Sequence, residues 1–320
     1  MAHFTIRQLE VFAAVARHAS VTAAAREVHL THPAVSMQLK QLEELWGLAL
    51  LERRGNGIQL TEFGVEMTTQ AEDLLEKVRA MTELAAGWRG ERRGKVRLGV
   101  VTTAKYFAPA LLARFLKSRP GIDFRLSVHN RDQILTELRG NTLDFVIMGR
   151  PPDGLDCVAT PFAPNPLGIL AAPAHPLVMR RHLSLDDLRD EPFIVREHGS
   201  GTRAAMERCF AENGSSFKTT MEMTSNETIK QAVMAGLGVT FLSLHTARNE
   251  LAQGRIVLLS VAGLPLRRQW YLVSGSKRTL APAVKAFGRF ILSEAEEILG
   301  VHEADVPQLM RPTGNRRKAK

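Results

Sequence analysis

Residues 20–46 read SVTAAAREVHLTHPAVSMQLKQLEELW and predict two helices joined by a short turn. Ser20 can cap the first helix, whose small alanine side chains allow another helix to cross close by. Thr31 can cap a longer second helix that runs to about Trp46. Pro33 lies in the first turn of this helix, where its missing N–H does no harm. The pattern is typical of a helix-turn-helix.

Two further elements flank this pair. Before it, Thr5 and Gln8 form a capping-box start. The apolar face of that preceding helix consists of Leu9, Phe12, Ala13 and Ala16. After the pair, residues 50–60 read LLERRGNGIQL, in which Gly-Asn-Gly between two short apolar runs predicts a tight hairpin. Residues 1–60 therefore predict an all-α winged helix-turn-helix, with the hairpin as its wing.

The helix of residues 31–46 has a face expected to be buried, formed by Val35, Leu39, Leu42 and Trp46. Its opposite face carries small polar, basic and apolar groups, which suit a helix that reads base edges in the major groove of DNA. A plain three-helix bundle with a solvated face would show the same spacing. Two arginines at the base of the hairpin suit the phosphate backbone or the minor groove. The predicted DNA-binding residues are His32, Pro33, Ser36, Met37, Lys40, Arg53 and Arg54.

Residues 61–94 predict a long linker helix followed by a hinge. Thr61 can cap the helix, and apolar residues recur along it at steps of four and three, which is a heptad seam. The seam residues are Met67, Ala71, Leu74, Val78, Met81, Ala85 and Trp88. Because charged residues leave only this narrow apolar stripe, we expect two chains to dimerise along it; packing on its own domain is the alternative. Gly87, Gly90 and Gly94 lie among basic residues and indicate a flexible boundary.

Residues 95–300 alternate between strands and helices, which predicts a parallel α/β arrangement. Strands are expected at residues 95–101, 124–128, 143–148, 193–196, 218–224, 239–242 and 269–274. Helices are expected up to about residue 118 and at residues 131–139, 201–211, 226–235 and 282–299. The last strand and helix return to the first part, so we predict two Rossmann-like lobes with a cleft between them. Lobe one comprises about residues 95–162 and 268–300, and lobe two about residues 163–267.

Ligands of such sheets bind beyond the carboxyl ends of the strands, where helix N-termini present N–H groups to anions. We therefore expect the cleft to bind a small anionic metabolite through a carboxylate or phosphate group. The candidate residues in lobe one are Thr102, Thr103, Ala104, Lys105, Asn130, Gly149 and Arg150. The candidate residues in lobe two are Ser200, Gly201, Thr202, Arg203, Ser225 and Asn226. Any single one could equally be an ordinary cap or turn residue, whereas the set favours a binding cleft.

The amino-terminal sequence resembles the signature of the LysR-type transcriptional regulators. The resemblance lies in residues 20–25 (SVTAAA), 30–43 (LTHPAVSMQLKQLE), 51–53 (LER) and 60–64 (LTEFG). It implies a periplasmic-binding-protein-like effector domain, and a dimer of dimers on an inverted-repeat site in double-stranded DNA. RNA polymerase is a further partner of such proteins. The DNA contacts of the family correspond to His32, Pro33, Ser36, Met37 and Arg53. Many relatives have arginine in place of this methionine, which cannot donate a hydrogen bond to guanine and could contact a thymine methyl instead.

A second, local resemblance lies in residues 102–109 (TTAKYFAP) and 149–152 (GRPP). These segments are similar to the LysR-type subfamily that controls the Calvin-cycle operons encoding Rubisco. The similarity implies activation of carbon-fixation genes, tuned by an anionic effector such as ribulose bisphosphate, phosphoenolpyruvate or NADPH, and no cofactor. A LysR-type regulator of another metabolic pathway is the alternative.

The composition is that of a globular protein, with 45% hydrophobic and 23% charged residues in 320. The net charge is +9, but residues 1–95 carry 12 basic and 12 acidic side chains. DNA binding is therefore inferred from the residue pattern and not from the bulk charge. Residues 301–320 carry five basic and two acidic side chains and predict a disordered basic tail.

Other classes of protein are disfavoured. No apolar run suits a membrane span and the start lacks the pattern of a secretory signal, so we expect a cytoplasmic, nucleoid-associated protein with no membrane partner. Cys157 and Cys209 show no metal-ligand spacing and are expected to be reduced packing residues. An enzyme acting on a sugar phosphate is a remote alternative, because no nucleophile elbow, P-loop, dinucleotide fingerprint or metal-spaced histidines are present. A transporter's solute-binding protein would need an export signal and no helix-turn-helix.

Overall fold

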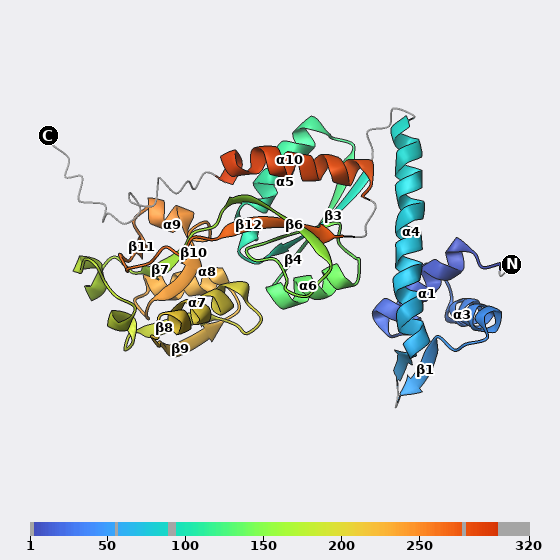
Figure 1. Ribbon diagram of the computed structural model, residues 1–320, viewed down its shortest axis with the longest axis horizontal. Helices are drawn as coiled ribbons and strands as arrows, with labels where there is room; N and C mark the ends of the chain where they lie inside the picture. Colours follow the sequence, from blue (N-terminus) through green and yellow to red (C-terminus); the bar gives the residue numbers. More distant parts are fainter. Residues whose placement is uncertain (1–2, 55–56, 89–93, 277–279, 300–320) are drawn as a thin grey trace. The chain divides into compact units, whose positions relative to one another are not determined.

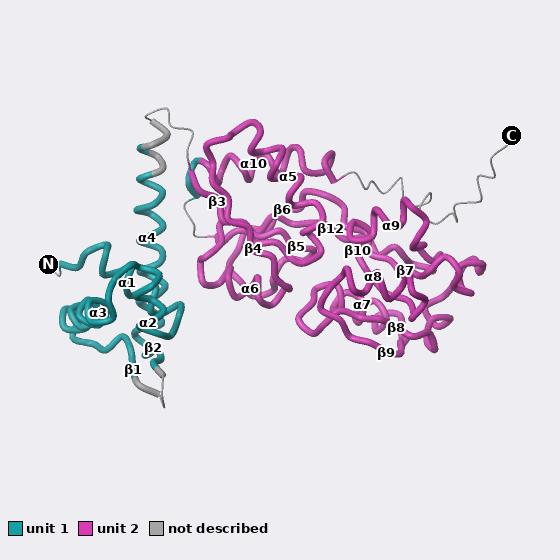
Figure 2. The backbone as a smooth tube through the Cα atoms, turned by 180° about the vertical axis from the view of Figure 1, so that it is seen from behind, with its two compact units in different colours: residues 1–93, 277–282 teal, residues 94–276, 283–320 magenta. Residues whose placement is uncertain are grey.

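The computed structural model describes residues 3–54, 57–88, 94–276 and 280–299. The chain forms two compact units, residues 1–93 with 277–282 and residues 94–276 with 283–320, shown in two colours in Figure 2. The predicted hinge glycine Gly90 and the predicted basic tail lie outside the described residues.

Unit one contains the predicted helix-turn-helix and hairpin (Figure 1). Its elements are α1 (Ile6–His18), α2 (Val21–Glu27), α3 (His32–Trp46), β1 (Leu51–Arg54), β2 (Gly57–Leu60) and α4 (Glu62–Trp88). The caps predicted from the sequence are confirmed, because Thr5, Ser20 and Thr31 each accept a hydrogen bond from a backbone N–H three residues later. Strands β1 and β2 pair antiparallel as a hairpin. Local hydrogen-bonding chemistry thus fixes where each of these helices begins.

Helix α4 packs its amino-terminal part against the helix-turn-helix. Thr61 accepts a hydrogen bond from the N–H of Gly64 at 2.9 Å. A Cβ atom at Gly64 would lie 2.1 Å from the carbonyl oxygen of Leu50, so only glycine allows this approach. Ala71 is buried and Met67 packs against the core of the same unit. The prediction that Ala71 faces a second chain is therefore wrong, since its own domain covers it, and Met67 is partly covered by the same core.

Unit two contains the two lobes, joined by two crossing segments. The elements of lobe one are β3 (Gly94–Val101), η1 (Ala104–Tyr106), α5 (Ala108–Ser118), β4 (Ile122–His129), α6 (Arg131–Arg139), β5 (Phe145–Met148), β6 (Cys157–Pro164), β12 (Gln269–Gly275) and α10 (Pro282–Leu299). Those of lobe two are β7 (Leu167–Ala171), η2 (Pro176–Met179), η3 (Asp186–Leu188), β8 (Pro192–Arg196), α7 (Gly201–Glu212), β9 (Lys218–Met223), α8 (Asn226–Met234), β10 (Thr240–Ser243), α9 (Arg248–Ala252) and β11 (Val257–Leu258). At the crossing, the N–H of Asn165 donates to the carbonyl oxygen of Arg268 at 2.7 Å.

The sheet of lobe one has the strand order β4-β3-β5-β12-β6. Strands β3, β4 and β5 are parallel, whereas β12 pairs antiparallel with both β5 and β6. The predicted parallel arrangement is confirmed for β3, β4 and β5, and the sheet is mixed because the chain leaves the lobe along β6 and returns along β12 in the opposite sense. Phe145 contacts Phe287 of α10, while its neighbour Val146 lies beside Ile134 of α6 near Gly99. Helices α10 and α6 therefore cover opposite faces of this sheet (Figure 1).

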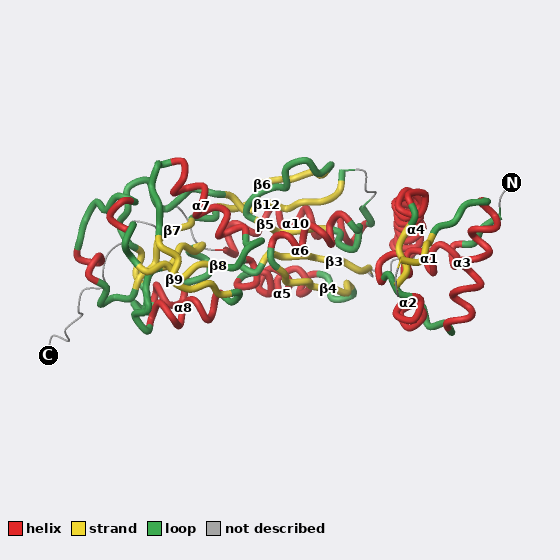
Figure 3. The backbone as a smooth tube through the Cα atoms, turned by 90° about the horizontal axis from the view of Figure 1, so that it is seen from below, coloured by secondary structure: helices red, strands yellow, loops and turns green. Residues whose placement is uncertain are grey.

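Lobe two is also less regular than predicted. Strands β8 and β9 are parallel, but β10 and β11 pair antiparallel with β7. Strands β6, β7 and β11 were not predicted. Residues of α7 pack with Ile169 and Phe193, and residues of α8 pack with Leu170 and Ile194, so the two helices cover opposite faces (Figure 3). The strand ends and the start of α7 are thereby brought to the boundary with lobe one.

Candidate functional site

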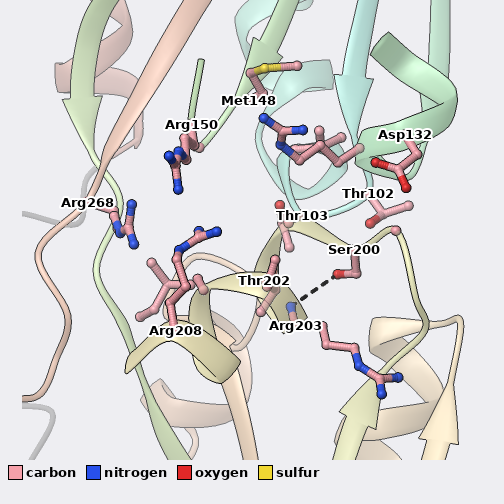
Figure 4. A pocket seen from close by; sticks show the side chains of 18 of the residues that line it. Thr102, Thr103, Asp132, Met148, Arg150, Ser200, Thr202, Arg203, Arg208 and Arg268 are labelled. Atoms are coloured by element: carbon pink, nitrogen blue, oxygen red, sulfur yellow. Dashed lines mark hydrogen bonds between the residues drawn. The ribbon is translucent and has the colours of Figure 1, made fainter. Parts of the chain in front are cut away.

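A cavity of 330 Å³ lies within unit two, lined by residues of both lobes (Figure 4). Lobe one contributes the ends of β3 and β5, the start of α6, and the crossing segments. Lobe two contributes the start and the inner face of α7. This is the edge where carboxyl ends of strands meet a helix N-terminus, as predicted from the α/β pattern.

Eight of the predicted effector-binding residues line this cavity. They are Thr102, Thr103, Gly149, Arg150, Ser200, Gly201, Thr202 and Arg203. Thus the sequence pattern identified both walls of the cavity. It did not identify three of the five arginines that give the cavity its charge.

The start of α7 presents N–H groups of its first turn, which have no partner within the helix. Ser200 caps this helix, accepting a hydrogen bond from the N–H of Arg203 at 3.5 Å. Gly199 precedes the cap with φ +81°, and a Cβ atom there would lie 2.8 Å from Asp132 of the opposite lobe. The helix can therefore approach lobe one this closely only with glycine at residue 199. Such a helix end favours an anion because its N–H groups and dipole point toward it.

Five arginines line the cavity, and four of them are hereafter called the arginine cluster: Arg131, Arg150, Arg208 and Arg268. Figure 4 shows three of them, Arg150, Arg208 and Arg268, gathered in one part of the cavity. The Nε of Arg208 is buried and has no hydrogen-bond partner among the described residues. Burial, together with repulsion from the other three arginines, lowers the pKa of Arg208. The pKa of Arg131 is also lowered, mainly by burial.

The carboxylates of the cavity only partly balance this charge. Asp153 accepts a hydrogen bond from Arg150 at 2.9 Å, and Glu207 accepts one from Arg203 at 2.8 Å. Among the described residues, neither Arg208 nor Arg268 forms an ion pair with a carboxylate. The cavity is therefore cationic and suited to an anionic ligand.

Three arginines of the cluster, Arg131, Arg208 and Arg268, were missed by sequence reasoning. Arg208 lies two turns along α7 and not among the first residues after a strand, where ligand-binding groups are expected. It follows Gly201 by seven residues, so the two share one face of the helix. This spacing is the signal that could have found it. Arg268 lies on a crossing segment, and no pattern in the sequence places it beside the others.

Five predicted effector residues are not part of the cavity lining, because they serve the structure around it: Ala104, Lys105, Asn130, Ser225 and Asn226. Asn130 and Ser225 cap α6 and α8, the roles considered as their alternative. Ala104 is fully buried at the start of η1, and the Lys105 ammonium lies 5.3 Å from the ring of Tyr106. Asn226 is buried and accepts a hydrogen bond from Arg196 at 2.6 Å.

The predicted DNA-binding residues of α3 lie together on its exposed face. His32, Pro33, Ser36, Met37 and Lys40 are all exposed, and Met37 has 54% of its surface accessible. On the opposite face Val35, Leu39 and Leu42 are buried as predicted, whereas Trp46 is partly buried and packs edge-on against two aromatic rings. The side chains of Arg53 and Arg54 lie outside the described residues, although their backbone forms β1. The exposed face of α3 carries polar, basic and apolar side chains, as a helix that reads the major groove does.

The later part of the α4 seam is exposed in the single chain. Leu74 and Met81 have 38% and 70% of their surfaces accessible, Val78 is half-buried and Ala85 is exposed. The side chain of Trp88 lies outside the described residues. The apolar stripe available to a partner therefore runs from residue 74 onward.

Sites of other kinds are not found in the parts of the chain that the structure describes. Within them, no group of three or more His, Cys, Asp and Glu side chains could hold a metal ion. Cys157 and Cys209 are free thiols, and burial raises the pKa of both. None of the described helices is both long and apolar enough to span a bilayer.

Two family models match the chain. Residues 6–65 match the bacterial regulatory helix-turn-helix protein, lysR family, and residues 89–296 match the LysR substrate binding domain. The second match alone covers more than half of the chain. It includes the whole lining of the cavity.

Curated relatives match over nearly the full length. The chain is 48% identical over 293 residues to a RuBisCO operon transcriptional regulator of Allochromatium vinosum, covering 92% of this chain and 97% of the relative. It is 44% identical over 296 residues to the HTH-type transcriptional regulator CfxR of Cupriavidus necator, covering 92% and 93%. A solved structure of the Synechocystis CcmR regulatory domain in complex with 2-PG is 37% identical with a TM-score of 0.61, covering 63% of this chain and 97% of that one. The chain therefore belongs to the LysR family of transcriptional regulators.

Proposed function

We propose that this LysR-family protein controls the transcription of carbon-fixation genes in response to a small phosphorylated anion bound between its two lobes. The target genes are supported by the relatives that are RuBisCO operon regulators. The ligand class is supported by the CcmR regulatory domain with its bound 2-PG. The protein binds DNA through the exposed face of α3 and the wing.

The observation that carries the ligand class is the arginine cluster. Its members repel one another, and Arg208 is held partly buried without a carboxylate partner among the described residues. An anion in the cavity relieves this repulsion, whereas a neutral or cationic ligand does not. The first turn of α7 and the hydroxyls of Thr103 and Thr202 add donors for phosphate oxygens.

The size of the cavity narrows the choice among the effectors implied by the sequence. Its 330 Å³ lies at the lower end of the range for small-molecule sites. Ribulose bisphosphate and phosphoenolpyruvate fit this size better than the dinucleotide NADPH. We therefore favour a short-chain phosphate ester or phosphorylated acid as the effector.

Calorimetry on the full-length protein tests this proposal. We expect 2-phosphoglycolate, phosphoenolpyruvate and ribulose bisphosphate to bind more tightly than NADPH or uncharged sugars. The same compounds should change the footprint of the protein on DNA from upstream of the Rubisco genes, and binding to that DNA should weaken steeply with salt. Failure of all three phosphates to bind would reject the ligand class, and indifference to that DNA would reject the target genes.

A further inference from the structure

We propose that Arg196 is a positioning residue for the effector: it orients the hydroxyl of Thr102 so that this group donates its proton into the cavity. The inference rests on the proposed function, because it concerns how the cavity recognises an anion. Arg196 itself does not line the cavity. It acts through Thr102, which does.

Arg196 is held rigidly at the end of β8 in lobe two. Only 2% of its surface is exposed. Its guanidinium donates two hydrogen bonds to the Glu197 carboxylate, both at 2.8 Å, and one to the side-chain oxygen of Asn226 at 2.6 Å. The buried charge is therefore balanced and its direction fixed, as a bidentate arginine–carboxylate pair requires.

The remaining hydrogen bond of Arg196 crosses to lobe one. The NH2 group donates to Oγ1 of Thr102 at 2.9 Å. A threonine hydroxyl has one proton to donate and two lone pairs with which to accept. Because Arg196 can only donate, the Thr102 proton must point elsewhere, and no acceptor for it is found among the described residues. The oxygen of an anion in the cavity can accept this proton.

This arrangement makes the hydroxyl selective for anions. Without Arg196, the Thr102 hydroxyl could rotate and present a lone pair to the ligand, and this lone pair would repel an anion. With Arg196 in place, the positive guanidinium also polarises the O–H bond and strengthens its donation. Since Thr102 belongs to lobe one and Arg196 to lobe two, the donor is correctly set only while the lobes keep this arrangement.

A double-mutant cycle on the full-length protein tests the inference, with 2-phosphoglycolate and inorganic phosphate as probes in calorimetry. Arg196→Lys and Thr102→Val should each weaken binding about tenfold, the effect of one hydrogen bond to a charged group. The double variant should bind no more than about twofold more weakly than Thr102→Val alone, because both changes remove the same donor. Thr102→Ser, which keeps the hydroxyl, should keep both the affinity and its dependence on Arg196.

The controls separate positioning from a loss of folding. Arg189→Lys alters an exposed arginine that pairs with Asp186 and should leave the affinity unchanged. Asn226→Ser removes one partner of Arg196 without touching the cavity lining. With Thr102 present, Asn226→Ser should weaken binding about threefold, because one hydrogen bond is partly lost. In the Thr102→Val protein the same change should leave binding unaltered. This comparison tests the positioning role even if Arg196→Lys fails to fold.

The outcomes distinguish this inference from the proposed function. Additive losses in the cycle, or an Arg196→Lys protein that binds as tightly as wild type, would overturn the positioning role and leave the anion site standing. A wild-type protein that binds neither probe would overturn the anion site itself, and the positioning role with it.

Discussion

The imidazole of His245 lies with Nε2 3.0 Å from the carbonyl oxygen of Pro164, where β6 leaves lobe one for lobe two. The rings of Phe107 and Trp270 pack against it edge-on, at centroid distances of 5.8 and 6.1 Å. Burial in this apolar contact disfavours the imidazolium and lowers the pKa of His245 to about 4. The neutral ring donates its Nε2–H to the carbonyl and ties β10 to the crossing segment.

This relationship predicts a pH dependence of stability. In the unfolded chain His245 takes up a proton as the pH falls through 6.5, whereas in the folded protein it does so only near pH 4. The free energy of unfolding should therefore fall between about pH 6.5 and pH 4, and His245 should account for about 3 kcal/mol of the loss. Urea unfolding of His245→Gln and wild type across this range measures the contribution. The amide can still donate to Pro164 but does not titrate.

The matched control is His198→Gln, because the side chain of His198 is 81% exposed. That variant should retain the full pH dependence of wild type. If His245→Gln lost stability with falling pH as steeply as the control, the buried neutral imidazole would not be its cause.

The arginine cluster predicts opposite effects on stability and on binding. Arg208→Met removes a charge that three other arginines repel, while keeping most of the packing of the side chain. The ligand-free protein should melt about 2 °C higher, as expected for a gain of about 1 kcal/mol in a domain of this size. Its affinity for 2-phosphoglycolate should fall about tenfold or more, because a charged hydrogen-bond donor is lost.

Calorimetry and thermal melting of the same preparations check both effects. Arg189→Met, at an exposed ion pair of lobe two, supplies the control and should change neither quantity appreciably. A loss of stability together with a loss of binding in Arg208→Met would mean that the arginine supports the fold and does not recognise the ligand.

Helix caps could be predicted from sequence, and the grouping of the arginine cluster could not. Thr5, Ser20 and Thr31 cap their helices through contacts within three residues, so the local pattern specifies them. Arg208 and Arg268 come together only because the chain crosses between the lobes twice. Such a juxtaposition depends on tertiary packing, and the helical spacing that places Arg208 on the same face as Gly201 does not place Arg268 beside it.

The sheet direction shows the same division between local and tertiary information. Strand β3 and its parallel neighbour β4 follow from alternation of strands and helices along the chain. Strand β12 has a sequence pattern similar to that of these parallel strands. It nevertheless runs antiparallel to β5, because the chain enters it from lobe two. Strand β7 was missed because its five residues follow a segment containing Pro164 and Pro166, which suggests a loop.

The exposed part of the α4 seam predicts the oligomeric state. Met81→Asp places a charge on the apolar stripe, and burying it against a partner helix without a counter-charge is costly. We expect the variant to dissociate into smaller species in sedimentation experiments while its circular dichroism is retained. Thr69→Asp, on the opposite face of the helix, should leave assembly unchanged. Equal assembly of wild type and Met81→Asp would place the dimer interface elsewhere.

The exposed face of α3 predicts two separable kinds of DNA contact. Lys40 is exposed and lies 3.5 Å from Glu44, an ion pair weak enough to exchange for a phosphate. Lys40→Ala should weaken binding to all sequences alike and reduce the slope of log K against log salt by about one. Met37→Ala removes no charge and should keep this slope. It should relax discrimination at one base pair, because an apolar contact to a thymine methyl is lost.

Fluorescence anisotropy measures both variants at several salt concentrations, on a fragment selected from the genome by the wild-type protein and on its single-base variants. Lys117→Ala provides the control, since it removes the same charge from an exposed site on α5 in unit two. If Lys117→Ala lowered the salt slope as much as Lys40→Ala, net charge and not α3 would govern affinity. If Met37→Ala discriminated among the variant sites as wild type does, the methionine would lie outside the groove, and the reading of bases would depend on the other exposed residues of the helix.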